Sequence, residues 1–196
     1  TQLRFVSPAL DILYNDFRGL EPILYSKNKN KILINESIKL KNICFHYPNS
    51  SIEALRNINI TIPAKSTIGL VGSTGSGKTT TVDIILGLLN AQKGTLKVDN
   101  KIINKTNARA WQKSVGYVPQ QIYLSDNTIS ANIAFGIDSK DIDHMAVENA
   151  SKIAKLHEFV SNELPKKYET KVGERGVRLS GGQRQRIGIA RALYHK

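Results

Sequence analysis

The sequence is short of cysteine, histidine and long apolar runs, and each scarcity excludes a class of protein. The one cysteine, Cys44, rules out a disulfide framework, and we expect it to be a small buried residue on a strand. The four histidines, His46, His144, His157 and His195, show no metal-ligand spacing. No apolar run approaches the roughly 20 residues that cross a bilayer. We therefore expect a globular domain without a metal site built from protein side chains alone.

Positive charge is in excess, and its distribution bears on the choice of partner. The 196 residues include 28 Lys and Arg against 16 Asp and Glu, a net charge of +12, and 40% are apolar, enough for a core in one or two lobes. Such a charge is compatible with nucleic acid or an anionic membrane as partner. The lysines, however, are scattered among asparagine and isoleucine, and no aromatic residues alternate with them. We expect no nucleic-acid partner.

A phosphate-binding motif, G-x-x-x-x-G-K-[ST], is matched at every fixed position within residues 72–80. These residues are Gly72, Ser73, Thr74, Gly75, Ser76, Gly77, Lys78, Thr79 and Thr80. Glycines allow successive backbone N–H groups to converge on an anion at the start of a helix. In this pattern Lys78 reaches the outer phosphates of a nucleotide, and the Thr79 hydroxyl ligates Mg²⁺. An ordinary Gly/Ser turn is the alternative, but it matches the fixed positions by chance only about once in a hundred such chains.

The residues on either side of the motif predict a strand and a helix in the required order. The apolar run 67–71 predicts a strand buried on both faces. After the motif, Val82, Ile85, Leu86 and Leu89 recur at helical spacing. Strand, glycine loop and helix together favour a nucleotide site.

Period-two patterns predict further strands. Residues 38–45 and 53–61 are expected to form two strands ahead of the run 67–71, which suggests an antiparallel edge attached to a parallel, helix-flanked core. Residues 94–101 predict a hairpin that turns at Asp99 and Asn100. A short helix over 107–113 follows, in which we expect Trp111 to be a packing residue.

The second half of the chain is expected to be mostly helical. Residues 115–118 predict one more buried strand, and Gln120 follows it at a carboxyl end, where ligands gather in open α/β sheets. Residues 128–162 predict a separate helical lobe. A glycine-rich turn over 173–176 then leads to a terminal helix.

The first 25 residues have the spacing of an amphipathic helix, for which Ser7 and Pro8 are suited as N-cap and first-turn proline. We expect a connector helix over 1–25 from a preceding transmembrane domain, or a local packing helix as the alternative. A polar linker over 26–37 follows. The apolar positions of this helix, three or four residues apart, are Leu3, Val6, Leu10, Leu13, Phe17 and Leu20.

A second glycine pair precedes the terminal helix. Ser180-Gly181-Gly182-Gln183 has the form of a capping box, with Ser180 as the N-cap. A cap alone does not favour two glycines, because each costs roughly 1 kcal/mol relative to alanine in a helix. A serine hydroxyl, two N–H groups without neighbouring Cβ atoms and a helix N-terminus are suited to bind a second anion.

Four motifs in this order resemble those of the nucleotide-binding domain of an ABC transporter. Leu179-Ser180-Gly181-Gly182-Gln183 matches the signature motif of that family, and residues 72–79 match its Walker A loop. Tyr47 falls at the adenine-stacking aromatic residue, and Gln120 falls at the glutamine of the Q-loop. Residues 170–176 are similar to the segment before the signature in exporter-type members.

This resemblance covers nearly everything from Ile38 onward and implies a fold and an activity. The implied fold is α/β, a P-loop NTPase core with a mostly parallel sheet flanked by helices, an antiparallel β edge subdomain and an inserted helical subdomain. Residues 38–196 would form this domain, incomplete at its C-terminus. The implied activity is binding and hydrolysis of ATP with Mg²⁺, which powers export of a lipid, glycolipid or peptide across a membrane.

The resemblance also implies roles for the site residues. Tyr47 stacks adenine, residues 72–80 hold the phosphates, and Thr79 and Gln120 hold Mg²⁺. The implied partners are a second copy of the domain, in a homodimer, and a transmembrane domain upstream on the same chain, at the cytoplasmic face of a membrane. Ser180, Gly182 and Gln183 would act in trans on ATP held by the facing copy. The implied catalytic residues are Lys78, Gln120, Ser180, Gly182 and Gln183.

Two other functions stay open at this point. One is a soluble ABC-type ATPase that acts on nucleic acid or ribosomes, and the other is a regulatory module that binds ATP without turnover. The printed residues do not reach the Walker B aspartate, the water-polarising glutamate, the D-loop or the switch histidine of the family. We therefore expect these residues alone to lack turnover and to expose apolar surface.

Overall fold

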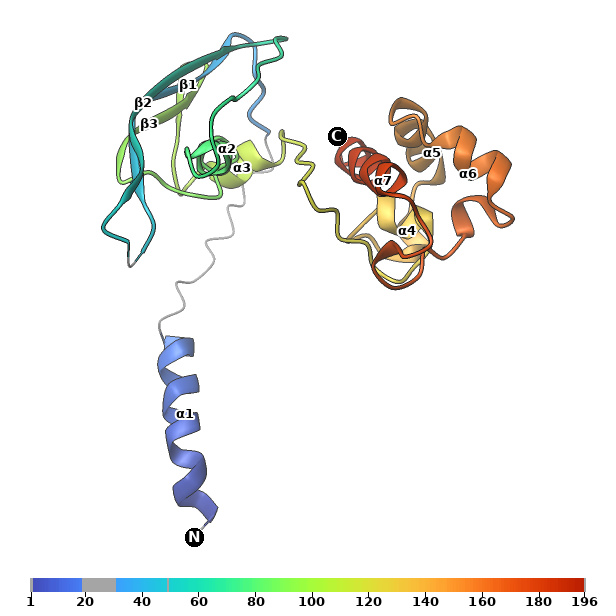
Figure 1. The fold of residues 1–196 in the computed structure, drawn as a ribbon, viewed down its shortest axis with the longest axis horizontal. Helices are drawn as coiled ribbons and strands as arrows, with labels where there is room; N and C mark the ends of the chain where they lie inside the picture. Colours follow the sequence, from blue (N-terminus) through green and yellow to red (C-terminus); the bar gives the residue numbers. More distant parts are fainter. Residues whose placement is uncertain (1, 19–30, 49, 196) are drawn as a thin grey trace.

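The computed structural model describes residues 2–18, 31–48 and 50–195, which form one sheet, seven α-helices and three short 3-10 helices. Strands β1–β3 curve over α2 and α3, and α4–α7 form a second body further along the chain (Figure 1). The strands are β1 (Ser37–His46), β2 (Glu53–Pro63), β3 (Lys93–Val98) and β4 (Lys101–Ile103). The helices are α1 (Gln2–Arg18), α2 (Lys78–Ile85), α3 (Ala108–Gln112), α4 (Ile129–Ile133), η1 (Ser139–Asp141), α5 (His144–Ile153), α6 (His157–Glu163), η2 (Lys167–Glu169), η3 (Glu174–Gly176) and α7 (Gly181–Tyr194).

The sheet is antiparallel, in the order β2-β1-β3-β4. On β1, apolar and polar residues alternate, so that Ile38, Leu40, Ile43 and Phe45 face the core. Leu40 lies opposite Ile60 of β2 and Leu96 of β3. The two predicted strands at 38–45 and 53–61 and the antiparallel β edge subdomain are therefore confirmed.

The hairpin between β3 and β4 turns where the sequence predicts it. Asp99 adopts a left-handed φ of 51°, and its carboxylate accepts hydrogen bonds from the backbone N–H groups of Ser37, Asn35 and Glu36 at 2.8–2.9 Å. These three donors hold the pKa of Asp99 below its usual value. The turn thereby ties the start of β1 to the end of β3.

Helices α2 and α3 cover the inner face of the sheet. Trp111 is 1% exposed and its indole N–H donates to the carbonyl of Ile85 at 2.6 Å, so the predicted packing role is confirmed. The predicted helical face through Leu89 is too long, because α2 ends at Ile85. Gly87, with φ 68°, closes the helix through its N–H bond to the carbonyl of Ile84.

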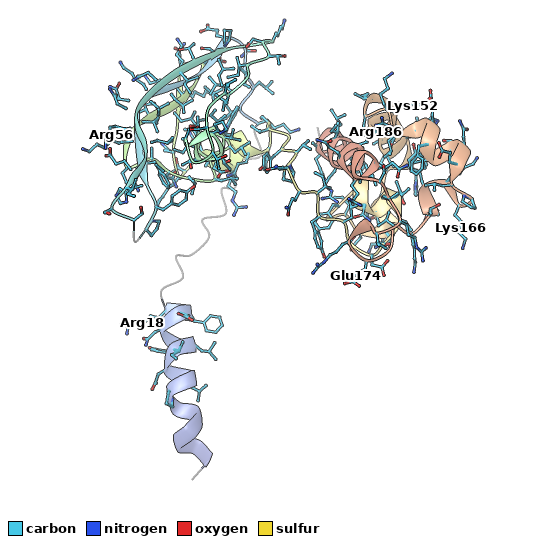
Figure 2. All side chains as sticks on the ribbon, viewed as in Figure 1. Arg18, Arg56, Lys152, Lys166, Glu174 and Arg186 are labelled. Carbon is cyan, nitrogen blue, oxygen red and sulfur yellow. The ribbon has the colours of Figure 1, made fainter. Side chains whose placement is uncertain are left out.

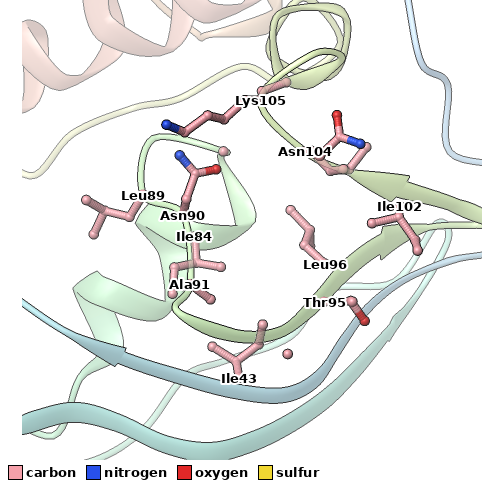
Figure 3. A pocket seen from close by; sticks show the side chains of 14 residues that line it. Ile43, Ile84, Leu89, Asn90, Ala91, Thr95, Leu96, Ile102, Asn104 and Lys105 are labelled. Carbon is pink, nitrogen blue, oxygen red and sulfur yellow. The ribbon is translucent and has the colours of Figure 1, made fainter. Parts of the chain in front are cut away.

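A cavity of about 270 Å³ lies between this helical layer and the sheet (Figure 3). Its walls are mostly aliphatic, with Ile43 and Leu96 from the sheet and Ile84 from α2, and Asn90 and Lys105 also line it. None of the predicted site residues lines it. We interpret it as incompletely filled space between two layers.

The second body has its own core, as the prediction of a helical lobe over 128–162 requires. Thr128 and Asp143 cap α4 and α5 by accepting backbone N–H bonds, and α7 packs against both helices. Its large apolar side chains that are fully buried are Leu124, Ile129, Ile133, Val147, Leu156, Val160, Val172 and Ile187.

The expected parallel strands at 67–71 and 115–118 are not formed, so the prediction of a mostly parallel sheet is wrong for the described residues. Both segments are irregular. Val71 is 97% exposed and Tyr117 is 47% exposed, which confirms the expectation of exposed apolar surface. A strand needs a neighbour to pair its backbone groups, and a parallel strand needs cover on both faces, but the described chain pairs no strand with either segment.

The N-terminal helix also differs from its prediction. It begins at Gln2 rather than after Ser7, and Pro8 lies inside it. Proline costs a helix the one hydrogen bond that its missing N–H would donate, and α1 continues past that gap to Arg18. Leu20 and the first part of the predicted linker, residues 26–30, lie outside the described residues.

Charged side chains such as Arg56, Lys152 and Arg186 project outward from the two bodies (Figure 2). No helix among the described residues combines the length and apolar character needed to cross a bilayer.

Candidate functional site

The backbone conformation at Gly75 and Gly77, and close contacts at Gly77, require glycine in the loop 72–77. Gly75 and Gly77 adopt left-handed φ angles of 81° and 85°. A Cβ atom on Gly77 would lie 2.6 Å from Leu55 Cδ2 and 2.7 Å from the carbonyl oxygen of Ala54. The loop therefore passes against the start of β2 at a distance that only glycine permits.

Lys78 closes the loop around its own ammonium group. Its Nζ donates to the carbonyl oxygens of Gly72 at 2.9 Å and Ser73 at 2.7 Å, and to Ser76 Oγ at 3.4 Å. Lys78 is also the first residue of α2, whose N-terminal N–H groups carry partial positive charge. A full charge and a helix N-terminus thus coincide, which suits an anion with several negative oxygens.

The next two threonines have different surroundings. Thr79 is exposed, and its hydroxyl forms no hydrogen bond within the described part of the chain. Thr80 is 6% exposed, and its Oγ1 lies 3.1 Å from the hydroxyl of Tyr47. A free hydroxyl beside a phosphate cradle fits an Mg²⁺ ligand, so the residues present agree with the predicted metal role of Thr79.

Tyr47, the predicted adenine-stacking residue, lies at the edge of this loop. It follows the last residue of β1, and its ring meets that of Phe45 edge-on at 5.0 Å. The ring is 42% exposed. The fold thus brings together Tyr47 and the loop, which are separated by 25 residues or more in the sequence.

Gln120 is not joined to the loop by any hydrogen bond in the described part of the chain. It is exposed, in a segment that passes along α7, where Gly188 leaves room for Ile122. Its predicted contacts with Mg²⁺ and the attacking water stay a prediction.

At the start of α7, Ser180 and Gln183 form the predicted capping box. Ser180 Oγ accepts the N–H of Gln183 at 3.2 Å, and Gln183 Oε1 accepts the N–H of Ser180 at 2.7 Å. Gly181 and Gly182 between them are exposed and have no left-handed φ. A Cβ on Gly182 would meet nothing within 4 Å, and one on Gly181 only Arg184 at 4.0 Å.

The segment 176–179, just before this capping box, is held by contacts with Leu124 and Arg184. Gly176 has a φ of 71°, and a Cβ there would lie 2.7 Å from Leu124 Cδ1. The Arg184 guanidinium donates to the carbonyl of Leu179 at 2.6 Å. The serine and glycines therefore stand on a rigid base with their outer side open.

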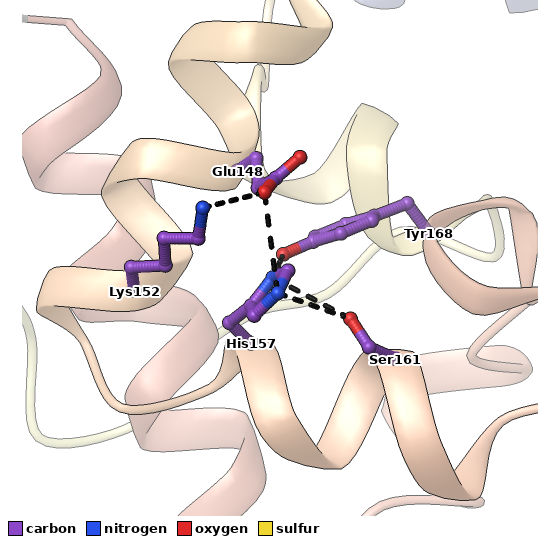
Figure 4. Close-up of polar contacts among 5 residues, drawn as sticks. All are labelled: Glu148, Lys152, His157, Ser161 and Tyr168. Atoms are coloured by element: carbon purple, nitrogen blue, oxygen red, sulfur yellow. Dashed lines mark hydrogen bonds and ion pairs between the residues drawn. The ribbon is translucent and has the colours of Figure 1, made fainter.

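A polar cluster in the helical lobe was missed by the sequence analysis, which treated His157 as one of four unremarkable histidines. His157 Nδ1 lies 2.8 Å from the hydroxyl of Tyr168, its Nε2 lies 4.0 Å from Glu148 Oε1, and Ser161 Oγ lies 3.4 Å from the same Nε2 (Figure 4). Burial raises the pKa of Tyr168. The cluster joins η2 to α5 and α6, and no residue pattern in the sequence predicts it.

The strand register also gathers lysines that look scattered in the sequence. Lys39 of β1 lies directly opposite Lys97 of β3, and Lys41 and Lys93 point to the same outer face. None of the four forms an ion pair within the described residues. Because these four lysines lack acidic partners, this face is positively charged. The opposition of Lys39 and Lys97 also costs stability, since like charges directly across a sheet repel.

A family model described as ABC transporter matches residues 55–196. Among curated proteins, the chain is 40% identical over 159 residues to an uncharacterized ABC transporter ATP-binding protein, YfiB, of Bacillus subtilis, covering 81% of this chain and 27% of that protein. It is 43% identical over 157 residues to the ATP-dependent lipid A-core flippase of Saccharophagus degradans, covering 80% of this chain and 26% of the flippase. The chain thus spans about a quarter of the length of these relatives.

Among solved structures, a bacterial Atm1-family ABC exporter with ATP bound superposes with a TM-score of 0.82 and 28% sequence identity. The match covers 98% of this chain and 33% of the exporter. The similarity thus includes both bodies of the fold.

Proposed function

Because this chain belongs to the ABC transporter family as an ATP-binding domain with exporter-type relatives, we propose that it hydrolyses ATP to drive export, by closing on a second copy of itself. The observation that carries this proposal is the contrast between two glycine sites. The loop 72–77 is closed around Lys78 by internal contacts, whereas Gly181 and Gly182 are exposed, and among the described residues only Arg184 comes within 4.0 Å of a Cβ added at either. A site with open amides on a rigid base is suited to meet something from outside the chain.

Each residue then has a role that its environment supports. Lys78 and the N-terminus of α2 offset the charge of the outer phosphates, and the free hydroxyl of Thr79 would hold Mg²⁺ together with Gln120. When bound there, Mg²⁺ would supply positive charge against the negative charge of the phosphates. Tyr47 offers a ring face to adenine.

Ser180, Gly182 and Gln183 would act on the ATP of the facing copy. The helix N-terminus and the exposed N–H groups favour the charge that develops on the transferred phosphoryl group. The capping box does not compete with this role, because it leaves the N–H groups of Gly181 and Gly182 outside its two bonds. Catalysis would then require two copies, and closure would couple hydrolysis to motion.

The surroundings of the domain follow from the same proposal. Residues 1–25 would connect it to a transmembrane domain, residues 26–37 would be a linker, and residues 38–196 would lie at the cytoplasmic face of a membrane. A lipid is the first cargo class to test, since one relative is named a lipid A-core flippase.

The test is ATP hydrolysis by the intact protein in lipid vesicles. We expect Lys78→Ala to reduce the rate by at least about 100-fold, because the group that offsets the phosphate charge is gone. Lys113→Ala, on an exposed lysine away from the loop, is the matched control and should retain the rate. Wild-type turnover by Lys78→Ala would contradict the proposal.

The same preparation separates the alternatives. Stimulation of turnover by lipid or another transported substrate supports an exporter, whereas stimulation by RNA or DNA would support the soluble ATPase. Binding of ATP with no turnover would support the regulatory module.

A further inference from the structure

The Tyr47 ring is held at both of its ends. At its base, the Phe45 ring meets it edge-on, at a centroid distance of 5.0 Å and an interplanar angle of 87°. At its tip, the hydroxyl lies 3.1 Å from Thr80 Oγ1. A tyrosine that is 42% exposed, in a loop after a strand, would otherwise be free to rotate about two side-chain bonds. The two contacts therefore fix the direction in which the exposed ring face points.

The partner of this hydroxyl belongs to α2, the helix that directly follows the loop 72–77, rather than to the sheet. Thr80 lies in the first turn of α2, two residues after Lys78, and is 6% exposed. Its neighbour Thr81 is equally buried at 5%, but bonds within the helix, from Oγ1 to the carbonyl of Gly77 at 2.9 Å. Thr81 therefore forms its hydrogen bond at the start of its own helix, whereas Thr80 forms one with Tyr47.

On the basis of the proposed function, we propose that Thr80 is a positioning residue for Tyr47, and that this hydrogen bond aims the ring at the base of the nucleotide whose phosphates the loop holds. Tyr47 supplies the stacking surface, and Thr80 sets its orientation. Base recognition is thereby coupled to the phosphate site through one pair of side-chain oxygens. Removing either hydroxyl should weaken the contribution of the base, and removing that of Tyr47 should leave the contribution of the phosphates.

The experiment measures dissociation constants of the intact protein for ATP and for inorganic tripolyphosphate, which has the phosphates but no base. The variants are Tyr47→Phe, Thr80→Val, and the two combined. Tyr47→Phe keeps the ring, so a loss reports its orientation rather than its area. Thr80→Ser keeps the hydroxyl and should restore ATP binding, and Thr81→Val is the matched control for loss of a buried threonine hydroxyl in the same turn.

We expect each single variant to bind ATP about three- to tenfold more weakly, the range for one partly exposed hydrogen bond. The double variant should be no weaker than the weaker single variant, because both remove the same bond. Tripolyphosphate binding should stay within about twofold of wild type in Tyr47→Phe, because Tyr47 lies outside the residues 72–80 that hold the phosphates. Thr81→Val should leave the ratio of the two dissociation constants unchanged.

Three results would overturn the inference while the proposed function stands. These are wild-type ATP affinity in Tyr47→Phe, additive losses in the double variant, or an equal loss of tripolyphosphate and ATP affinity in Tyr47→Phe. Failure of the wild-type protein to bind ATP would instead overturn the proposed function, and the inference with it. Because Tyr47→Phe removes one oxygen from a half-exposed ring, it keeps the test valid even where Thr80→Val fails to fold.

Discussion

The loop 72–77 and the start of α7 are both rich in glycine, but the causes differ. In the loop, left-handed φ angles and the approach of Ala54 and Leu55 exclude any side chain at Gly77. At Gly181 and Gly182 the backbone is helical and a Cβ would stand in open space. Backbone conformation and contacts within the chain explain Gly75 and Gly77, and neither explains Gly181 and Gly182. We infer that an exposed glycine that neither its own backbone conformation nor a contact within the chain requires is kept for contact with another molecule.

The largest effect that tests this comparison is expected from Ser180→Arg. A bulky cation at the open site should reduce ATP hydrolysis by at least about 100-fold, since it blocks approach of the facing copy. Binding of ATP to a single copy should change little, because the loop 72–77 is untouched. Hydrolysis rates and ATP dissociation constants of the intact protein check both points. Ser180→Thr, which preserves the N-cap, is the control, and a collapse of ATP affinity in Ser180→Arg would refute the assignment.

A matched glycine pair sharpens the comparison further. Gly77→Ala should lower the free energy of unfolding by about 2–4 kcal/mol, because it adds left-handed strain and a steric clash. Gly182→Ala should leave this free energy unchanged or raise it by up to about 1 kcal/mol, since alanine favours the helix.

Denaturant unfolding measures the free energy of unfolding of both variants, and ATP hydrolysis rates are measured on the same two variants. Gly182→Ala should slow hydrolysis in spite of its stability, because its methyl group covers a bare amide. Equal destabilisation by the two substitutions would remove the distinction between the sites.

The smallest effect concerns Asp99, which belongs to the sheet and lies apart from both sites. Its pKa is lowered in the folded state by three backbone donors, so its stabilising contribution is present above the usual aspartate pKa of about 3.9 and is lost as the pH falls below it. Asp99→Ala should lower the thermal midpoint modestly at neutral pH and flatten its decline on acidification. Thermal melts between neutral and acidic pH check this. An unchanged acid profile would show that the turn does not depend on the carboxylate.

Local patterns predicted most of the elements. Alternation located β1 and β2, Asp99 located the hairpin, and the residues 180–183 located the cap of α7, because each depends on neighbours in the sequence. The strands expected at 67–71 and 115–118 failed because apolar runs do not specify their pairing partners. The end of α2 was missed because Gly87 was not weighed as a helix terminator.

In the candidate site, too, the sequence predicts the local contacts and not the contacts between distant residues. The loop 72–80 follows from its spacing, since the contacts of Lys78 are local. The bond from Tyr47 to Thr80 spans 33 residues, and the cluster around His157 joins three elements. Such contacts depend on tertiary packing, and nothing in the local sequence predicts them. The outer lysine face likewise depends on the register between β1 and β3.

The central claim is that the open glycine site serves the loop of another copy, and cross-linking tests it most directly. Cysteines at Thr74 and Ser180 are introduced into the intact protein, with Cys44 changed to serine and any other cysteine replaced. The account predicts that a short thiol cross-linker joins two copies, giving a band at twice the mass of one copy, and that ATP increases its yield. A cross-link confined to one copy, or a yield indifferent to ATP, would contradict it.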